Sequence, residues 1–378
     1  MGRVLLQRIA PEGTHFAGGR EFSRIALLCA GGDEVAKLDP LGADATFTHL
    51  PAWNAAGDSE RIALALVDAT PSRAQVARMT TAEAAASLRD LGMLASSLMR
   101  HGVDFSTVIP ELERRLIELG ALVEMVPRDT VYHYGVWNPS GPRERSFTGE
   151  PGEAALIAAA RTAAPAIDGT LYELIATLAH PIRSQSFADG CQRAAHRLAE
   201  ILCSIGKAKK EIPPLFFART LRPYFIDLRI GGEKFAGASA APLSVCIVDH
   251  ILWSSDCEDQ AFSDFQSEQI RYNLPHWRRL YAATRGQPSL VTRLREMITR
   301  GRAPPPEVIS AVTELLQVLL IFRGRHRYVA MRAYDESIRL YDVGSGGHGT
   351  STLEHLFALT RDAFRSLRST APSNGDTP

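Results

Sequence analysis

A single histidine near the C-terminus, His326, is the residue whose type and setting point most directly to chemistry. It belongs to a segment in which mostly apolar residues recur every three or four positions, as on one face of a helix: Val312, Leu315, Leu319, Phe322, His326 and Ala330. A neutral imidazole buried on such a face could ligate a metal ion or a haem iron. A lone histidine there is more often a hydrogen-bonded core residue, so the interpretation depends on its surroundings.

A glycine-rich motif follows this segment and has two interpretations. Gly344–Gly349 satisfies the G-x-G-x-x-G pattern of a dinucleotide or methyl-donor site, and the run Ile338–Val343 before it is strand-like. Such a site needs further strand–helix units, whereas only one more helix, Thr352–Arg368, remains in the chain. We therefore expect a ligand-facing loop that offers backbone N–H groups and the Ser345 hydroxyl, or a helix-entry turn capped by Thr350 or Ser351.

Long helices must position these residues. Pro165 should kink one of the predicted helices, and Pro304–Pro306 suits the start of another. Strand signals are sparse, so the sequence predicts an all-α fold. The predicted helices are Thr81–Arg100, Ile109–Leu122, Glu153–Ala179, Phe187–Lys207 and Glu307–Tyr334.

Polar, glycine-containing stretches predict the domain organisation. The stretch over residues 138–152 predicts a boundary between a smaller N-terminal domain, residues 1–150, and a larger helical domain, residues 151–370. Residues 371–378 should form a disordered tail. A second irregular region, residues 229–242, is rich in glycine and alanine and would let the backbone approach a flat ligand.

Composition excludes several classes of protein. The 378 residues are 45% hydrophobic, and 42 basic residues balance 42 acidic ones, so there is no electrostatic footprint for nucleic acid or an anionic membrane. Five cysteines without a Cys-x-x-Cys pair predict reduced thiols. The N-terminus lacks a signal-peptide pattern, and charge or proline interrupts every long apolar segment. We expect a cytoplasmic protein without membrane insertion.

Four motifs, in this order, resemble the histidine-ligated haem oxygenases of the indoleamine and tryptophan 2,3-dioxygenase superfamily. Within it, the chain most resembles the monodechloroaminopyrrolnitrin synthases, and the likeness runs from about Asp39 to the last helix. The motifs are Val131–Asn138, Leu215–Tyr224, Phe235–Ala241 and the pair formed by Phe322-Arg323 with His326 and the later Gly344–Gly347.

The resemblance implies a two-domain helical fold with haem between helices of the larger C-terminal domain. It makes His326 the iron ligand, gives Arg323 a haem propionate, and puts Gly237 and Ala238 beside the haem. Asp249 would hold Arg323 in place, with the neighbouring His250 as the alternative. Because no cysteine follows His326 by one turn and no Cys-x-x-Cys-His occurs, the haem should be non-covalent haem b.

For the substrate, the resemblance implies an amino-acid carboxylate bound by Arg222, since a guanidinium fork matches a carboxylate. Tyr334 and Ser345 would contact the substrate and serve catalysis, and Tyr134 and Ser239 would also bind it. The family's distal acid–base position falls within Ala158–Ala160, which has no suitable side chain. Proton transfer would then come from the substrate, the oxidant, or His133 or Tyr134 if they point inward, the alternative being that both are hydrogen-bonded core residues.

The implied activity is a haem-dependent oxidation of L-tryptophan or a substituted tryptophan such as the 7-chloro compound. An indole-ring rearrangement with decarboxylation, in pyrrolnitrin-like secondary metabolism, is the first hypothesis; tryptophan 2,3-dioxygenation or indole mono-oxygenation is the alternative. Dioxygen or peroxide would be the oxidant, with an electron-donor protein as a partner. A haem sensor or carrier without turnover is a rival from another class, and a methyl-donor or nucleotide-binding protein is a third.

Overall fold

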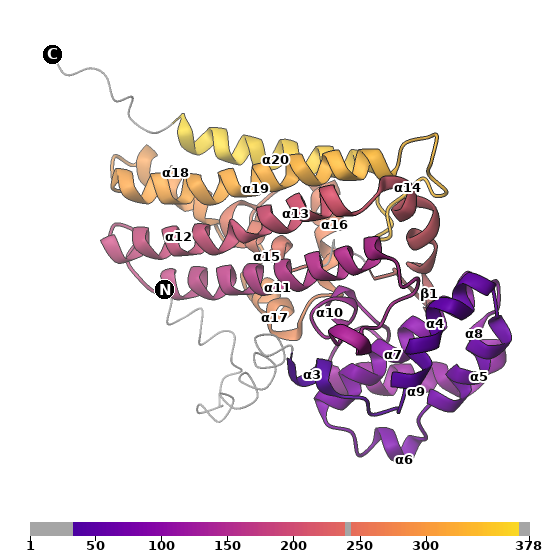
Figure 1. Ribbon diagram of the computed structural model, residues 1–378. Coiled ribbons are helices and arrows are strands. Elements are labelled where there is room, and N and C mark those ends of the chain that lie inside the picture. Colours follow the sequence, from indigo (N-terminus) through magenta and orange to yellow (C-terminus); the bar gives the residue numbers. More distant parts are fainter. Residues whose placement is uncertain (1–32, 239–242, 370–378) are drawn as a thin grey trace.

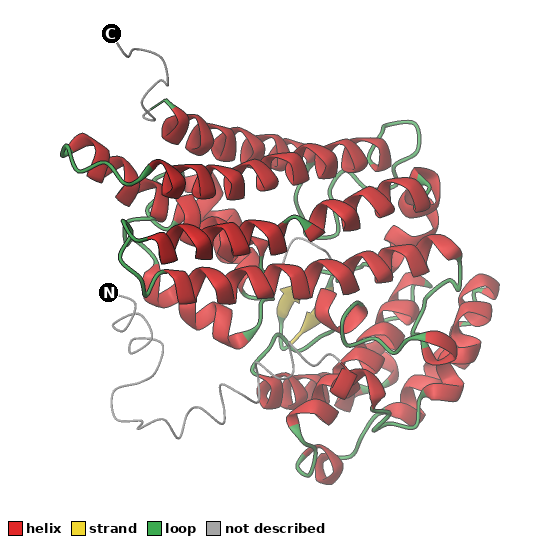
Figure 2. Ribbon diagram, turned by 60° about the vertical axis from the view of Figure 1, so that its left-hand side comes forward, coloured by secondary structure: helices red, strands yellow, loops and turns green. Residues whose placement is uncertain are grey.

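The computed structural model describes residues 33–238 and 243–369. Within these ranges the chain is almost entirely helical, as Figure 2 shows, and the all-α prediction is confirmed. The exception is a short antiparallel hairpin, β1 (Leu228–Ile230) paired with β2 (Glu233–Phe235). The tight turn between its strands uses Gly231 and Gly232, both with positive φ, a conformation that glycine adopts without strain.

The helices before residue 150 surround α7, which is alanine-rich and has most of its residues buried. A capping box formed by Thr80 and Glu83 begins α7, because each side chain accepts from the other's backbone N–H. Helices α5 and α9 pack against it. The elements are α3 (Asp33–Lys37), α4 (Asp44–Ala56), α5 (Ser59–Ala69), α6 (Arg73–Val76), α7 (Thr81–Arg100), α8 (Phe105–Val108), α9 (Pro110–Val123), α10 (Val131–Tyr134) and the 3-10 turn η2 (Gly141–Arg143).

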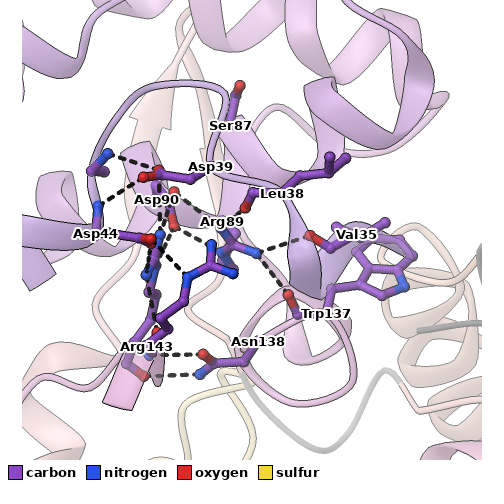
Figure 3. Close-up of polar contacts among 12 residues, drawn as sticks. Val35, Leu38, Asp39, Asp44, Ser87, Arg89, Asp90, Trp137, Asn138 and Arg143 are labelled. Carbon is purple, nitrogen blue, oxygen red and sulfur yellow. Dashed lines mark hydrogen bonds and ion pairs between the residues drawn. The ribbon is translucent and has the colours of Figure 1, made fainter. Parts of the chain in front are cut away.

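A buried network of charges fixes the segment after α10 against α7. Arg89 and Asp90 are fully buried and paired, and Arg89 also donates to the carbonyl oxygens of Val35 and Trp137 (Figure 3). Arg145, buried as well, reaches Asp90. Buried charges of this kind need such complete pairing, so the network sets where the chain between α10 and α11 lies.

A group of the helices after residue 150 lies side by side. Figure 1 shows α11, α12, α13, α19 and α20 as neighbouring rods, and the packed pairs are α11 with α12 and α13, α12 with α19, and α19 with α20. The elements are α11 (Pro151–Thr177), α12 (Gln185–Leu198), α13 (Glu200–Glu211), α14 (Pro214–Phe216), the π-helix η3 (Phe217–Leu221), the 3-10 turn η4 (Arg222–Tyr224), α15 (Val245–Asp249), the π-helix η5 (His250–Ser254), α16 (Gln260–Ile270), α17 (Pro275–Thr284), α18 (Leu290–Thr299), α19 (Pro306–Ala333) and α20 (Thr350–Arg368).

Most predicted helices are confirmed within a few residues, but two predictions are wrong. The single helix expected over Phe187–Lys207 is divided at Ala199, where ψ of −20° and an N–H bond from Leu202 tighten the chain into a 3-10-type turn. The run Ile338–Val343 forms turns and bends instead of a strand, and Leu340, Tyr341 and Val343 are exposed. Pro165 lies inside α11.

Other predictions about the whole chain have mixed outcomes. The cysteines in the described ranges, Cys191, Cys203, Cys246 and Cys257, are free. In the same ranges, no helix combines the length and apolarity needed to cross a bilayer. The division into two domains near residue 150 stays a prediction, and the expected tail lies outside the described residues.

Candidate active site

Arg222 lies where a π-helix gives way to a 3-10 turn, directly before Pro223. Arg222 keeps helical backbone angles, with φ of −51° and ψ of −35°, although proline disfavours them in the residue that precedes it. π-helical segments inside helices are frequent at functional sites. The guanidinium is buried: one terminal nitrogen donates to the Phe225 carbonyl oxygen at 2.9 Å, and the other to those of Val343 and Gly344 at 3.3 Å each. Its Nε–H is buried without a partner in the described ranges. A cation with an unused donor is therefore ready for an acceptor.

Tyr334 and Ser345 lie beside this guanidinium, so three predicted substrate residues come together. Tyr334 follows the last turn of α19, and its hydroxyl lies against the glycine-rich loop, 3.6 Å from where a Cβ on Gly344 would be. Burial raises the pKa of the Tyr334 phenol, which keeps it protonated at neutral pH, while the Arg222 charge partly offsets the rise. Tyr334 and Ser345 are 112 and 123 positions from Arg222 in the sequence. The hydrogen bonds from Arg222 to the Val343 and Gly344 carbonyls hold the two segments together.

The glycine-rich loop is closed on itself. Gly344 N–H donates to the His348 carbonyl at 2.8 Å, Gly347 N–H donates to the Gly344 carbonyl at 2.9 Å, and Gly347 has a φ of 80°. Two of the N–H groups expected to face a ligand are thus used inside the loop. The expected hydroxyl cap of the following helix is also wrong, because Gly349 occupies the N-cap position without a side-chain bond.

An aromatic wall adjoins Arg222 and centres on Phe225. The ring of Phe225 meets Tyr134 edge-on, with centroids 5.3 Å apart, and lies 6.5 Å from Phe217, which in turn meets Tyr334 at 6.4 Å. Gly237 packs on the Phe225 backbone so closely that a Cβ there would lie 2.5 Å from its carbonyl oxygen. Only glycine fits this approach, which brings the predicted haem-side loop against the Arg222 segment.

Ala238, next to Gly237, is buried, as a small residue beside a flat ligand would be. Ser239, predicted to bind substrate, lies outside the described residues. Ala236, on the other side of Gly237, is tied to the protein through its N–H, which donates to the Tyr272 hydroxyl at 2.7 Å. The described part of this loop is therefore fixed to two neighbouring segments.

The hydroxyl of Tyr134 is not available to a substrate, because it donates to Glu153 Oε1 at 3.0 Å. Burial, and next the Glu153 charge, hold the pKa of Tyr134 well above its usual range. What Tyr134 presents to Phe225 is its ring. Sequence reasoning did not single out Glu153; its place in the first turn of α11 suggests an N-terminal cap, not a bond to a residue 19 positions earlier.

His326 is half-buried on α19, two turns before Tyr334, or about 12 Å along the axis at 1.5 Å per residue. Its ring stacks on Phe322 with centroids 5.7 Å apart. Burial, and next the Arg323 charge, lower the pKa of the His326 imidazole to about 4, so the ring is neutral at pH 7. No side chain or carbonyl in the described part of the protein bonds either ring nitrogen. The apolar stripe before it, Val312, Leu315 and Leu319, is buried as predicted.

Arg323, three residues before His326 on α19, is buried and ion-paired with Asp249 at the end of α15, and it also donates to Thr360 of α20. Asp249 accepts from Trp253 as well, at 2.9 Å. The Asp249–Arg323 contact predicted from the sequence is present. The alternative, His250, is turned to Thr284, with 2.8 Å between its Nε2 and the hydroxyl. A propionate partner for Arg323 stays a prediction.

The distal position predicted within Ala158–Ala160 lies next to α10. A Cβ on Gly135 would meet the Ala160 side chain at 2.8 Å, so the two segments touch. His133 of α10 is fully buried, and its Nδ1 accepts from the Thr130 N–H at 3.1 Å, which places the proton on Nε2. Burial lowers the pKa of His133 to about 3, so it is not a proton acceptor at neutral pH.

A second carboxylate that the sequence did not reveal is Asp168, in the middle of α11. Ser244 and Trp277 both donate to its Oδ1 at 2.9 Å, and the Tyr132 hydroxyl lies 2.5 Å from Ser244. Burial raises the pKa of Asp168 to about 7, although both hydrogen bonds lower it. Its partners lie 76 and 109 positions away, so only the fold brings them together.

Open hollows occur elsewhere in the described part of the molecule. One of about 470 Å³ is lined by residues 178–183 with Arg293 and Met297, and one of about 390 Å³ by residues near His250, Tyr281 and Arg285; neither is lined by Arg222, Tyr334 or His326. Among the described residues no cluster of three or more metal-ligating side chains exists. Axial ligation of haem by one histidine does not require such a cluster.

One comparison with known proteins bears on the identity of this site. The family model of monodechloroaminopyrrolnitrin synthase matches residues 77–373, well over half of the chain and all of the residues named above for the site. That is a family of enzymes, oxidoreductases that rearrange a tryptophan derivative in pyrrolnitrin biosynthesis. The resemblance inferred from the sequence motifs is confirmed. The chain therefore belongs to the monodechloroaminopyrrolnitrin synthase family.

Proposed function

We propose that this chain binds haem b through His326 and uses dioxygen or peroxide to rearrange and decarboxylate L-tryptophan or a 7-chlorinated tryptophan. The observation that carries the proposal is the buried, unpartnered Nε–H of Arg222 beside the Tyr334 hydroxyl. Tyr334 directly follows α19, the helix that carries the neutral, unpartnered imidazole of His326.

The substrate carboxylate would take the place now held by backbone oxygens. Arg222 donates to the carbonyls of Val343 and Gly344 through Nη2, at 3.3 Å, the long end of the hydrogen-bond range. A carboxylate accepting from Nε and Nη2 together forms two charge-assisted bonds, which are stronger than bonds to neutral carbonyls. A protein that only carries haem or senses a gas has no use for such a group.

The residues around His326 fit a haem. The imidazole is neutral, so a ring nitrogen lone pair is available, and no competing hydrogen bond within the described ranges has to be broken. Arg323, held by Asp249 and Thr360, ties α19 to α15 and α20 and so orients the helix that carries the ligand. When bound, haem would supply the redox-active iron that oxidation of an indole requires.

The remaining residues bind and orient the indole. Phe217 and Phe225 give an apolar wall, to which Tyr134 adds its ring edge. Tyr334 holds its proton, so it acts as a donor or orienting group toward the substrate, together with Ser345. Because Ala158–Ala160 carry no titratable side chain, the acid–base steps would depend on the substrate's own amino group and on the oxidant.

The test is product identification. Haem-loaded protein is incubated with L-tryptophan and with 7-chlorotryptophan under dioxygen with a reductant, and separately with peroxide, and products are identified by mass. The proposal predicts a rearranged product that has lost carbon dioxide. N-formylkynurenine as the main product would overturn the rearrangement and leave the dioxygenase alternative. No product, with no effect of either amino acid on the haem spectrum, would favour a sensor or carrier.

A further inference from the structure

Glu153, which none of the proposed steps uses, has an unusual environment. It lies in the first turn of α11 and is fully buried. Its carboxylate accepts five hydrogen bonds: from the hydroxyls of Tyr134, Ser146 and Thr148, at 3.0, 2.7 and 2.7 Å, and from the backbone N–H groups of Phe147 and Thr148, at 2.8 and 2.7 Å. These donors and the N-terminus of α11 stabilise its charge.

Two of these donors belong to aromatic residues that pack on the Arg222 segment. Tyr134 meets the Phe225 ring edge-on, with centroids 5.3 Å apart and planes at 84°. Phe147 is stacked on Tyr224, with centroids 4.9 Å apart and planes at 14°. Tyr134 and Phe147 are themselves stacked at 6.0 Å. One carboxylate therefore fixes two rings that contact consecutive residues of the same turn.

That turn is the part of the chain that orients the guanidinium. Arg222 donates to the carbonyl oxygen of Phe225 at 2.9 Å, the shortest of its bonds to carbonyls. Gly237 packs against the same peptide group, so Phe225 cannot move without disturbing both the arginine and the loop. Displacing Phe225 by a few tenths of an ångström would turn the free Nε–H away from its acceptor, because hydrogen bonds weaken steeply with angle.

We infer that Glu153 is a positioning residue that, through Tyr134 and Phe147, fixes the Arg222 turn and aims the guanidinium at the substrate carboxylate. The inference rests on the proposed role of Arg222. It assigns Glu153 an effect on one half of the substrate only: the carboxylate end, which Arg222 binds, and not the indole. A purely structural role of Glu153 in the N-terminal helices would not discriminate between the two ends.

The test compares two ligands by titration calorimetry: L-tryptophan, and tryptamine, which lacks the carboxylate. In Glu153→Gln an amide N–H₂ replaces an oxygen that accepts hydrogen bonds, so the donors around it lose a partner. We expect tryptophan to bind about 10- to 100-fold more weakly, the size of loss that a small misplacement of a positioned group causes, and tryptamine to change by less than about threefold. Ser146→Ala is the matched control, because it removes one donor that contacts neither Tyr224 nor Phe225, and it should leave both affinities within about threefold.

Tyr134→Phe provides a second test should Glu153→Gln fail to fold. It keeps the ring but removes its bond to Glu153, and it should lower the tryptophan-to-tryptamine affinity ratio by about three- to tenfold. Equal losses for both ligands, or an unchanged ratio in both variants, would overturn the inference. Arg222→Lys is measured in parallel. If it leaves the tryptophan-to-tryptamine affinity ratio unchanged, the proposed function itself fails. If Arg222→Lys changes this ratio but the Glu153 and Tyr134 variants do not, only the positioning role of Glu153 is refuted.

Discussion

Arg222→Lys is the substitution whose effect can be worked out most fully from the contacts. Lysine keeps the positive charge but presents a single ammonium in place of a planar fork. A hydrogen bond to a charged group contributes about 1.5–3 kcal/mol, and the fork can give a carboxylate two of them, one from the free Nε–H and one from Nη2. The ammonium can replace one, so tryptophan should bind about 10- to 150-fold more weakly, at 1.4 kcal/mol per tenfold.

The assay separates this loss from a general disturbance of the site. Calorimetric dissociation constants are measured for L-tryptophan and for tryptamine, whose binding should change by less than about threefold. Removal of the guanidinium also takes away the hydrogen-bond donor of the Phe225 and Val343 carbonyls, while the Gly344 carbonyl keeps its bond from the Gly347 N–H, so a thermal melt must show that the variant is folded. Equal weakening of both ligands, or unchanged binding of tryptophan, would refute the assignment of Arg222 as the carboxylate clamp.

Two further predictions concern buried charges. The pKa of Asp168 is raised from 3.8 to about 7, so the stability that the protonated carboxyl contributes is complete below about pH 4 and is lost as the pH rises through 7. Asp168→Asn should therefore be more stable than the parent at pH 8, by up to about 4 kcal/mol. This difference in the free energy of unfolding should close toward pH 4. Urea unfolding at several pH values measures this, and a gap that does not vary with pH would contradict it. Asp249→Asn leaves the Arg323 charge buried without its carboxylate and should lower the free energy of unfolding by about 3–5 kcal/mol, part of which Arg323→Met in the same chain should restore. A decrease in the free energy of unfolding of less than about 1 kcal/mol would show that the Asp249–Arg323 pair does not hold α15 and α19 together.

The sequence predicts the helices well where the apolar period is long. The apolar repeats of α7 and α19 predict where these two helices begin and end to within one residue. The break at Ala199 has no such signal, because neither glycine nor proline marks it and alanine is a strong helix former. The strand-like run Ile338–Val343 has the right residue types, but Leu340, Tyr341 and Val343 are exposed and the run joins no sheet in the described structure.

The candidate site divides in the same way. The motifs identify Arg222, Tyr334 and Ser345 through resemblance, and the structure brings them together. The roles of Glu153 and Asp168 depend on partners that the fold supplies, which no local pattern encodes. Tyr134 shows the limit most clearly: its residue type suggests a group that contacts substrate, whereas its hydroxyl is bonded to Glu153 and only its ring faces the site.

The most direct measurement is the absorbance spectrum and haem content of purified protein reconstituted with haem, compared with His326→Ala and with His133→Ala as the control for loss of a buried histidine. We expect about one haem per chain and a Soret band in the parent and in His133→Ala. In His326→Ala both should be lost, or the band should shift as the axial ligand is removed. An unchanged haem content and spectrum in His326→Ala would contradict the assignment of His326 as the iron ligand.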